Sequence, residues 1–431
     1  MKNRYMLIVS LDAMVTEDLP YAKTLPNFAR IFQNSSQIDK VKTIYPTLTH
    51  PIHATLLTGC TAGKHGVICN ETFSPGNLIL PWYNSLPQIK VPTIFHKWHE
   101  AGYTIAACRW PHTEEADDII DYVIPELVEA HVSGKTNADL PDIYAKLCTP
   151  SLMPIINKYI DILDFNKRPM YEELQVNCLC DIIKEHKPNI MMTHLCMIDY
   201  ARHAKGLFGE HIKEAIDTLD VWLGKLIDTL EETGIYENTD IILLSDHGHL
   251  DIRRTICLNA ILAEKGWLQV ENGALKDWRV YIASATLSAH VYVKNKADED
   301  AVYKLLCEMA EDGIYGIDEV LTAAEADVRY GLSGCFSFVI ESDGYTSFND
   351  DWKRPFVRPC DPLDYRYGRA THGHMPEKGP QPPFIVSGPS FKKGVHLENG
   401  SILDEAPTFL YPFGLTLEDA DGKPIMELLN C

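Results

Sequence analysis

Acidic and imidazole side chains occur in this sequence at spacings that suit a metal site. Asp199 and His203 are four residues apart, so a helical turn would place both on one face. Asp246 and His247 are adjacent, and His372 stands in a loop next to a glycine. Carboxylate oxygen and imidazole nitrogen are ligands for Zn²⁺, with Mn²⁺ or another transition metal as an option. Each residue taken singly could instead be a helix cap, a surface residue or a loop residue, so the metal hypothesis depends on their joint occurrence.

A threonine lies where a short helix is expected to begin. Within the stretch 44–70, Thr49 and His50 precede an apolar segment, with Pro51 in its first turn and Gly59 at its end. A helix N-terminus has free N–H groups and a dipole that favour an anion. Thr49 is therefore either an ordinary cap residue, which the stretch alone favours, or a hydroxyl held beside a bound anion.

The elements that must position these side chains follow from hydrophobic patterning. Continuous apolar runs predict buried strands at 7–11, 189–198 and 240–244, followed by Asp12, Asp199 and Asp246. Amphipathic helices are expected along the chain, the clearest at 212–230. Ligands of open α/β sheets collect at the carboxyl ends of the strands. We therefore expect an α/β fold with a mostly parallel central sheet flanked by helices, and the three carboxylates at one edge.

The texture of the sequence changes from about residue 288. Residues 289–293 alternate between apolar and polar, 298–311 have a helical pattern, and 335–341 resemble a strand. We interpret 286–354 as a small α+β insertion. The expected catalytic domain then comprises residues 1–285 and 355–431.

Composition limits the partners and the location. The formal net charge of −21 argues against DNA, RNA or an anionic membrane surface as the main partner. An acidic chain can still bind phosphate where metal ions supply positive charge. The short apolar run that ends at Asp12 resembles a core strand more than a secretory signal, and no run reaches the roughly 18 apolar residues of a membrane span. The twelve cysteines include no CxxC pair, so we expect free thiols and a cytoplasmic location. The oligomeric state stays open, and a homo-oligomer is one option.

The order of these residues resembles the alkaline phosphatase superfamily, and within it the nucleotide pyrophosphatase/phosphodiesterase (type I phosphodiesterase) family. That family carries a P-T-x-T-x-P-x-H segment, then T-G and H-G pairs, then an asparagine. The matching positions here are 46–53, 58–59, 65–66 and Asn70. The resemblance covers about residues 5–285 and 355–415.

This resemblance implies two divalent metal ions, most often zinc. It assigns one ion to Asp199, His203 and His372, and the other to Asp12, Asp246, His247 and the Thr49 hydroxyl. Thr49 would attack phosphorus and form a phospho-threonine, and Asn70 would donate a hydrogen bond to a phosphoryl oxygen. The implied activity is hydrolysis of small-molecule phosphoesters, namely nucleotide-type or related phosphodiesters and pyrophosphates.

The residues that would select the substrate are less clear. The two positions that sandwich a base in nucleotide-cleaving relatives hold His50 and His194 here, and histidine stacks weakly. Trp110 would either line the pocket or belong to the core. Arg109 would either contact a phosphate or be a surface cation.

Two other functions stay open. The chain also resembles phosphonoacetate hydrolase, a sister family with the same metals and a threonine nucleophile. That activity needs cations for the substrate carboxylate, and Lys64, Arg202 and Lys205 are candidates. A non-catalytic protein that binds a phosphate ligand through metal ions could be built on the same fold.

Overall fold

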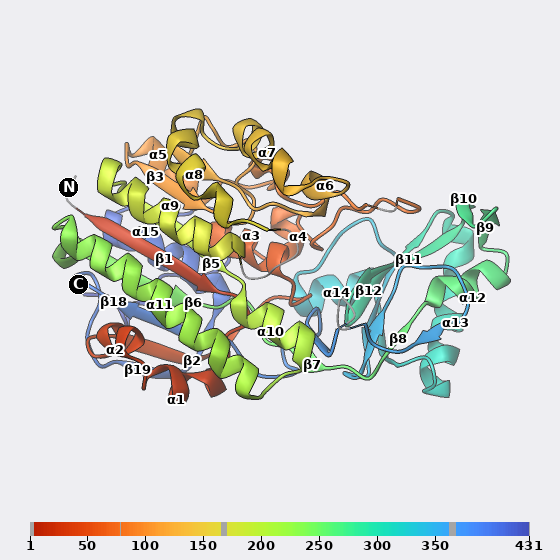
Figure 1. The fold of residues 1–431 in the computed structure, drawn as a ribbon. Coiled ribbons are helices and arrows are strands. Elements are labelled where there is room, and N and C mark those ends of the chain that lie inside the picture. The colour runs from red at the N-terminus through yellow and green to blue at the C-terminus, as the bar shows by residue number, and fades with distance from the viewer. Residues whose placement is uncertain (1–3, 78, 165–169, 362–367, 431) are drawn as a thin grey trace.

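Two lobes of unequal size make up the molecule (Figure 1). The structure, a computed structural model, describes residues 4–77, 79–164, 170–361 and 368–430. Both chain ends lie on the larger lobe, at the side far from the smaller lobe. The smaller lobe is therefore an insertion into the chain of the larger one.

The larger lobe is built on an eight-stranded sheet with the strand order β19-β2-β18-β6-β1-β5-β3-β4. β18 is antiparallel to both of its neighbours, and every other pair is parallel. The prediction of a mostly parallel sheet is confirmed. The strands are β1 (Tyr5–Leu11), β2 (Ser36–Lys42), β3 (Ile105–Cys108), β4 (Tyr122–Ile124), β5 (Ile190–Leu195), β6 (Thr239–Leu244), β18 (Phe384–Ser387) and β19 (His396–Ser401).

Helices cover both faces of this sheet, which explains why its central strands are continuous apolar runs. In β1, Met6 and Ile8 pack into one hydrophobic cluster, and Leu7 and Val9 pack into another. The first cluster includes helices α3 (Thr49–Thr58), α5 (Ile94–Glu100) and α15 (Glu405–Leu410). The second includes α2 (Pro26–Phe32), α7 (Leu140–Leu147), α8 (Met153–Tyr159), α9 (Met170–His186) and α11 (Glu210–Glu232).

Several short elements lie at the carboxyl end of the sheet or connect to it. Strands β7 and β17 form an antiparallel pair, and β17 lies against helix α10. The residues after β17 are thereby returned to the sheet edge. These elements are α1 (Leu19–Ala22), α4 (Ala62–His65), α6 (Glu129–Val132), α10 (Met197–Lys205), β7 (Leu250–Asp251) and β17 (Ala370–Thr371).

The smaller lobe has its own sheets and its own core. Its main sheet has the order β11-β12-β14-β13, beside a three-stranded sheet β15-β8-β16 and a hairpin β9-β10. Many apolar side chains of these strands and of α12 and α13 form a cluster of their own, whereas Tyr292, Leu321 and Val339 pack into the first cluster of the larger lobe. The elements are β8 (Arg254–Ile256), α12 (Leu258–Glu264), β9 (Leu268–Glu271), β10 (Ala274–Trp278), β11 (Val280–Ala285), β12 (Ser288–Val293), α13 (Glu299–Asp312), β13 (Ile317–Thr322), α14 (Ala323–Tyr330), β14 (Phe338–Ser342), β15 (Thr346–Phe348) and β16 (Val357–Arg358).

The predicted start of the insertion at residue 286 is wrong. β11 and β12 are one antiparallel hairpin, and residue 286 lies in its tight turn. Ile256 and Leu262 also belong to the core of the smaller lobe. The inserted lobe therefore begins near β8 and ends near β16, and the segment 1–285 includes part of it.

Candidate active site

The predicted ligand residues converge at the carboxyl edge of the large sheet. Asp12 follows β1 and Asp246 follows β6, and these strands are parallel neighbours. Thr49 is the first residue of α3. The element that carries Asp199 differs from the prediction. Strand β5 already ends at Leu195, and Asp199 lies in the first turn of α10. The helix nevertheless points the carboxylate back to the same edge.

Three imidazoles surround the Asp199 carboxylate. Its Oδ1 lies 3.1 Å from Nε2 of His203, one turn further along α10, and 3.9 Å from Nε2 of His372. The Nε2 of His249 is closer still, at 2.8 Å. The candidate ligand atoms of these four residues all lie within 4.8 Å of one another. The ligand set predicted from the sequence does not contain His249, the second histidine of the Asp-His-Gly-His run, for which a supporting role or a substrate contact was the expectation.

Backbone carbonyls determine which nitrogen of two imidazoles faces Asp199. His203 Nδ1 donates to the Ala370 carbonyl at 2.8 Å, and His372 Nδ1 donates to the Thr47 carbonyl at 3.0 Å. Because a carbonyl can only accept, each Nδ1 carries the proton and each Nε2 presents its lone pair. Histidines that bind metal ions are oriented in this way.

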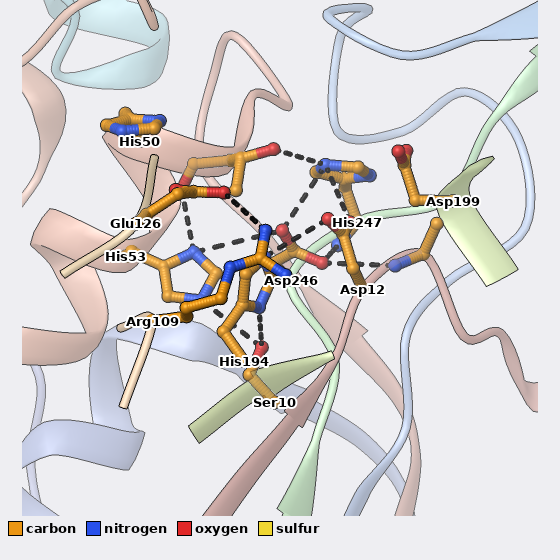
Figure 2. A network of polar contacts seen from close by, with 12 residues as sticks. Ser10, Asp12, His50, His53, Arg109, Glu126, His194, Asp199, Asp246 and His247 are labelled. Atoms are coloured by element: carbon orange, nitrogen blue, oxygen red, sulfur yellow. Dashed lines mark hydrogen bonds and ion pairs between the residues drawn. The ribbon is translucent and has the colours of Figure 1, made fainter. Parts of the chain in front are cut away.

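His247 is the centre of a second group (Figure 2). Its Nε2 lies 3.2 Å from the Thr49 hydroxyl, 3.3 Å from Asp246 Oδ2 and 3.5 Å from Asp12 Oδ1. These two carboxylate oxygens are buried and have no hydrogen-bond partner among the described residues. The structure thus brings together the four residues that the sequence assigned to the second ion.

The electrostatic state of the carboxylates follows from their burial. Burial raises the pKa of Asp12 well above its ordinary value, and repulsion from Asp199 and Asp246 adds to this. Burial also raises the pKa of Asp246. Ionised Asp12 and Asp246 carboxylates therefore need a positive charge beside them at this buried site.

The same burial keeps the His247 and His372 imidazoles neutral. It lowers the pKa of His247 and of His372 well below the ordinary value, and neighbouring imidazoles add to the effect. Neutral imidazoles and buried carboxylate oxygens without partners are the donor set of Zn²⁺ or Mn²⁺, and a divalent cation would offset the repulsion between the carboxylates. The residues present therefore fit the two metal ions that the resemblance implies.

Asn70 is oriented by the start of α3. Its Oδ1 accepts the backbone N–H of His50 at 2.9 Å. Since an N–H group needs an acceptor, this contact assigns the oxygen and leaves Nδ2 as the donor end of the amide. Asn70 also lines a cavity together with His372. It can therefore donate to a group bound between them, and its contact with a phosphoryl oxygen stays a prediction.

The four residues predicted to contact substrate lie in the interior. His50 is buried, and its Nε2 is 2.9 Å from Asn84 Oδ1. Trp110 is fully buried, and its ring lies edge-on to the His53 ring with 5.1 Å between the ring centroids. Of the two roles expected for Trp110, its position agrees with packing in the core. None of the four lines either of the two cavities beside the site, as far as the described residues go.

The structure also corrects the predicted roles of Arg109 and His194, which belong to a buried polar network (Figure 2). His194 Nε2 lies 3.1 Å from Asp12 Oδ2, so this ring orients a carboxylate and is not placed to stack on a base. The Arg109 guanidinium lies 3.5 Å from the carboxylates of both Glu126 and Glu172. These acids balance its charge, so Arg109 is neither a surface cation nor a phosphate ligand.

Two residues that link α3 to this network were not predicted. His53 Nδ1 donates to the Thr49 carbonyl at 2.8 Å, and its Nε2 is 3.2 Å from Ser10 Oγ. His53 is the histidine of the P-T-x-T-x-P-x-H segment, which marked its position without indicating its role. Its contacts hold the helix turn that carries the Thr49 hydroxyl.

Two neighbouring cavities lie between residues 68–83 of the larger lobe and strands β11 and β12 of the smaller one. The near cavity borders the site through Leu48, Asn70 and His372. The far cavity extends toward the aromatic residues of the smaller lobe. Both are lined by Cys69, Glu71, Leu80, Ser284 and Asp350.

Comparison with known proteins agrees with this arrangement. The family model described as type I phosphodiesterase / nucleotide pyrophosphatase matches residues 6–373. An uncharacterized pyrophosphatase/phosphodiesterase of Schizosaccharomyces pombe is 24% identical over 253 residues, which are 56% of this chain and 44% of that protein. Ectonucleotide pyrophosphatase/phosphodiesterase family member 1 of Rattus norvegicus is 25% identical over 281 residues, 62% of this chain and 26% of that protein. The chain thus spans less than half the length of these relatives.

Solved structures show the same fold. Murine ectonucleotide pyrophosphatase/phosphodiesterase 5 superposes with a TM-score of 0.70 at 20% identity, covering 99% of this chain and 100% of that one. Its inactive threonine-to-alanine variant, solved in complex with AMP, superposes with a TM-score of 0.69 at 19% identity over the same shares. Among the described residues, no helix combines the length and apolarity needed to cross a bilayer. With the family match extending over most of its length, the chain belongs to the type I phosphodiesterase / nucleotide pyrophosphatase family.

Proposed function

We propose that this protein hydrolyses small phosphodiesters with Thr49 as the nucleophile. The observation that carries the proposal is the position of the Thr49 hydroxyl, 3.2 Å from His247 Nε2 in a buried group of carboxylates and imidazoles. Family membership supports the reaction class. The inactive threonine-to-alanine variant of the murine relative, with its bound AMP, supports a threonine in this role and a nucleotide-type ligand.

Two divalent metal ions, most suitably Zn²⁺, would lower the pKa of the threonine hydroxyl and of a water molecule and would offset charge on the phosphoryl group. Asp12, Asp246, His247 and Thr49 would hold one ion, and Asp199, His203 and His372 would hold the other. All other contributions come from the chain itself. The buried network around His194 keeps Asp12 in place, and the carbonyls of Ala370 and Thr47 keep two imidazoles turned inward.

The reaction has two displacements at phosphorus. Thr49 Oγ attacks phosphorus, the bond to the departing alcohol breaks, and the phosphoryl group remains on Thr49 as an ester. Water then attacks the same phosphorus and releases Thr49. Asn70 Nδ2 and the Thr49 backbone N–H, at the start of α3, can hold a non-bridging oxygen in both steps.

The structure does not favour the phosphonoacetate alternative. Lys64 pairs with Asp421 at 2.8 Å, and Arg202 is buried against Asp18 at 2.5 Å. No Lys or Arg occurs among the described residues that line the two cavities. Rates on a nitrophenyl phosphodiester, the corresponding monoester and phosphonoacetate would separate the three activities. The predicted cytoplasmic location, the exclusion of nucleic-acid polymers and membranes, and a homo-oligomeric state stay predictions.

The proposal is tested by Thr49→Ala in the metal-loaded enzyme, assayed with bis(4-nitrophenyl) phosphate. We expect turnover to fall by about three orders of magnitude or more, as for removal of a nucleophile, while both metal ions remain detectable by mass spectrometry. Thr416→Ala, at a surface threonine, is the control and should retain full activity. Equal activity of Thr49→Ala and the wild-type enzyme would exclude Thr49 as the nucleophile. Bound metal with no turnover of any phosphoester by the wild-type enzyme would favour the non-catalytic alternative.

A further inference from the structure

We propose that Arg202 is a positioning residue that holds the two ligand groups of the active site in a fixed arrangement. The inference rests on the proposed function, because it concerns the groups assigned to the two metal ions. It is carried by the burial of the guanidinium, by its three directed contacts and by the segments to which each partner is connected.

Arg202 lies on α10 beside two of the predicted metal ligands. Asp199 and His203 stand within one helical turn of it. Arg202 is 0% exposed, and the described residues that line the two cavities beside the site do not include it. A contact that fixes Arg202 therefore fixes the helix turn that presents both ligands.

The first contact connects α10 to the other ligand group. Arg202 Nε donates to the Ala13 carbonyl at 3.1 Å, and the Ala13 N–H donates to Asp246 Oδ1 at 3.2 Å. Ala13 also follows Asp12 directly in the chain. Its φ is +60°, a conformation that a residue with a side chain keeps only when its surroundings hold it. The two hydrogen bonds hold Ala13 in this way, so Asp12 and Asp246 are placed relative to α10.

The second contact is a buried ion pair. Arg202 Nη2 lies 2.5 Å from Asp18 Oδ2, and Asp18 is 5% exposed. The same oxygen accepts the Val15 N–H at 2.9 Å, which closes the chain after Ala13 into a turn. A buried ion pair is often no more stabilising than apolar side chains of similar volume. What the pair adds here is a contact of fixed length and direction between α10 and the segment 12–18.

The third contact leads to the remaining ligand. Arg202 Nη1 donates to the Leu207 carbonyl, and the Leu207 N–H donates to Asp251 Oδ1 at 2.7 Å. Asp251 lies in β7, which pairs with β17, and His372 follows β17. The four segments that carry the predicted aspartate and histidine ligands are thereby connected through one guanidinium. Its three nitrogens point in different directions of one rigid plane, which a single ammonium nitrogen cannot reproduce.

The test removes the ion pair without leaving a buried charge. In Asp18→Asn/Arg202→Met both charges are absent, so the penalty of an unpaired buried charge is avoided. Calorimetric titration of the metal-free protein with Zn²⁺ should give an affinity about 10–100-fold below that of the wild type. At saturating Zn²⁺, with both ions counted by mass spectrometry, kcat on bis(4-nitrophenyl) phosphate should also fall by about 10–100-fold, because a displacement of about 1 Å has a cost of this order.

Arg30→Met/Asp228→Asn is the matched control. This partly exposed pair joins α2 to α11 at 2.7 Å, and its loss should leave the Zn²⁺ affinity and kcat unchanged. Arg202→Lys is a second variant, which keeps a charge beside Asp18 and therefore decides the question if the double variant does not fold. Its single nitrogen cannot reach all three acceptors, so kcat should fall severalfold.

The melting temperature of the metal-free proteins separates positioning from stability. A double variant that melts earlier but keeps the Zn²⁺ affinity and the kcat of the wild type would show that the pair is merely structural and would overturn the inference. Arg202→Lys with wild-type affinity and kcat would overturn it as well. A wild-type enzyme that binds no metal ion or hydrolyses no phosphoester would contradict the proposed function instead.

Discussion

Replacing Gly373 by alanine tests whether the loop after β17 holds His372 in place. Gly373 has a φ of +91°, which costs a residue with a side chain about 1–2 kcal/mol. Its Cβ would lie 2.0 Å from the Ala285 carbonyl oxygen and 2.5 Å from Thr286 Oγ1. A normal contact is at least 3.0 Å, so the loop would have to move by about 1 Å, with strain of about 1–3 kcal/mol. We expect a total destabilisation of about 2–5 kcal/mol.

The displacement would be transmitted to the active site. The Gly373 N–H donates to the Thr47 carbonyl, which also accepts from His372 Nδ1. A shift of about 1 Å in a reacting group costs on the order of 100-fold in rate. Measurements of kcat/KM on a nitrophenyl diester, of bound metal and of thermal stability should all show a loss.

Gly102→Ala is the matched control. Gly102 has a φ of +78°, yet a Cβ there would meet nothing within 4 Å. The Gly102→Ala variant should have a free energy of unfolding lower by only the backbone cost of about 1–2 kcal/mol, and it should keep its activity. If Gly373→Ala were as active and as stable as Gly102→Ala, the claim that this close approach positions His372 would be refuted.

Three further outcomes are expected. Treatment with a chelator should lower thermal stability, and Zn²⁺ or Mn²⁺ should restore it, because the buried carboxylates would lose their counter-charge; a melting curve insensitive to chelator would contradict this. His249→Gln removes the imidazole 2.8 Å from Asp199 and should weaken metal binding by about 10–100-fold in a titration; unchanged affinity would show that His249 has no part in the site. Burial raises the pKa of Glu341 from 4.5 to about 7. The unfolded chain then releases this proton at lower pH than the folded one, so stability should fall as pH rises from about 4.5 to about 7, by up to about 3 kcal/mol. Denaturant titrations of the wild type and Glu341→Gln at pH 5 and pH 8 measure this, and a stability difference that does not change with pH would contradict it.

Local patterns were sufficient for the large sheet and for most of the predicted ligands. Helices cover both faces of β1 and β6, so every side chain of these strands is buried. The sequence before Asp12 and Asp246 is therefore continuously apolar, and such a run predicts a buried strand. The four-residue spacing of Asp199 and His203 fixed their common face even though the strand ends earlier than predicted. Such features depend on periodicity alone, which is present in one sequence.

The boundary of the smaller lobe could not be predicted in this way. The turn between β11 and β12 contains Thr286 with a φ of +64°, where tight hairpins ordinarily use glycine or asparagine. β9 and β10 carry mostly exposed side chains and lack a clear alternation. Neither this turn nor strands β9 and β10 could therefore be recognised from the sequence pattern.

The roles of Arg109 and His194 depend on distant partners. Arg109 is placed by Glu126 and Glu172, which come from other parts of the chain. His194 turns to Asp12 because β1 and β5 are neighbours in register. No single stretch of sequence contains this information, so residue type alone suggested contacts with substrate.

The two lobes contribute different side chains to the site and to the cavities beside it. Every residue assigned to bond cleavage lies on the larger lobe, whereas Asp350, His290 and the β11–β12 hairpin come from the inserted one. Replacement of the insertion during evolution would change the walls of both cavities and leave the proposed nucleophile and metal ligands in place. A chimaera that carries a relative's insertion should inherit the donor's preference together with the recipient's turnover chemistry.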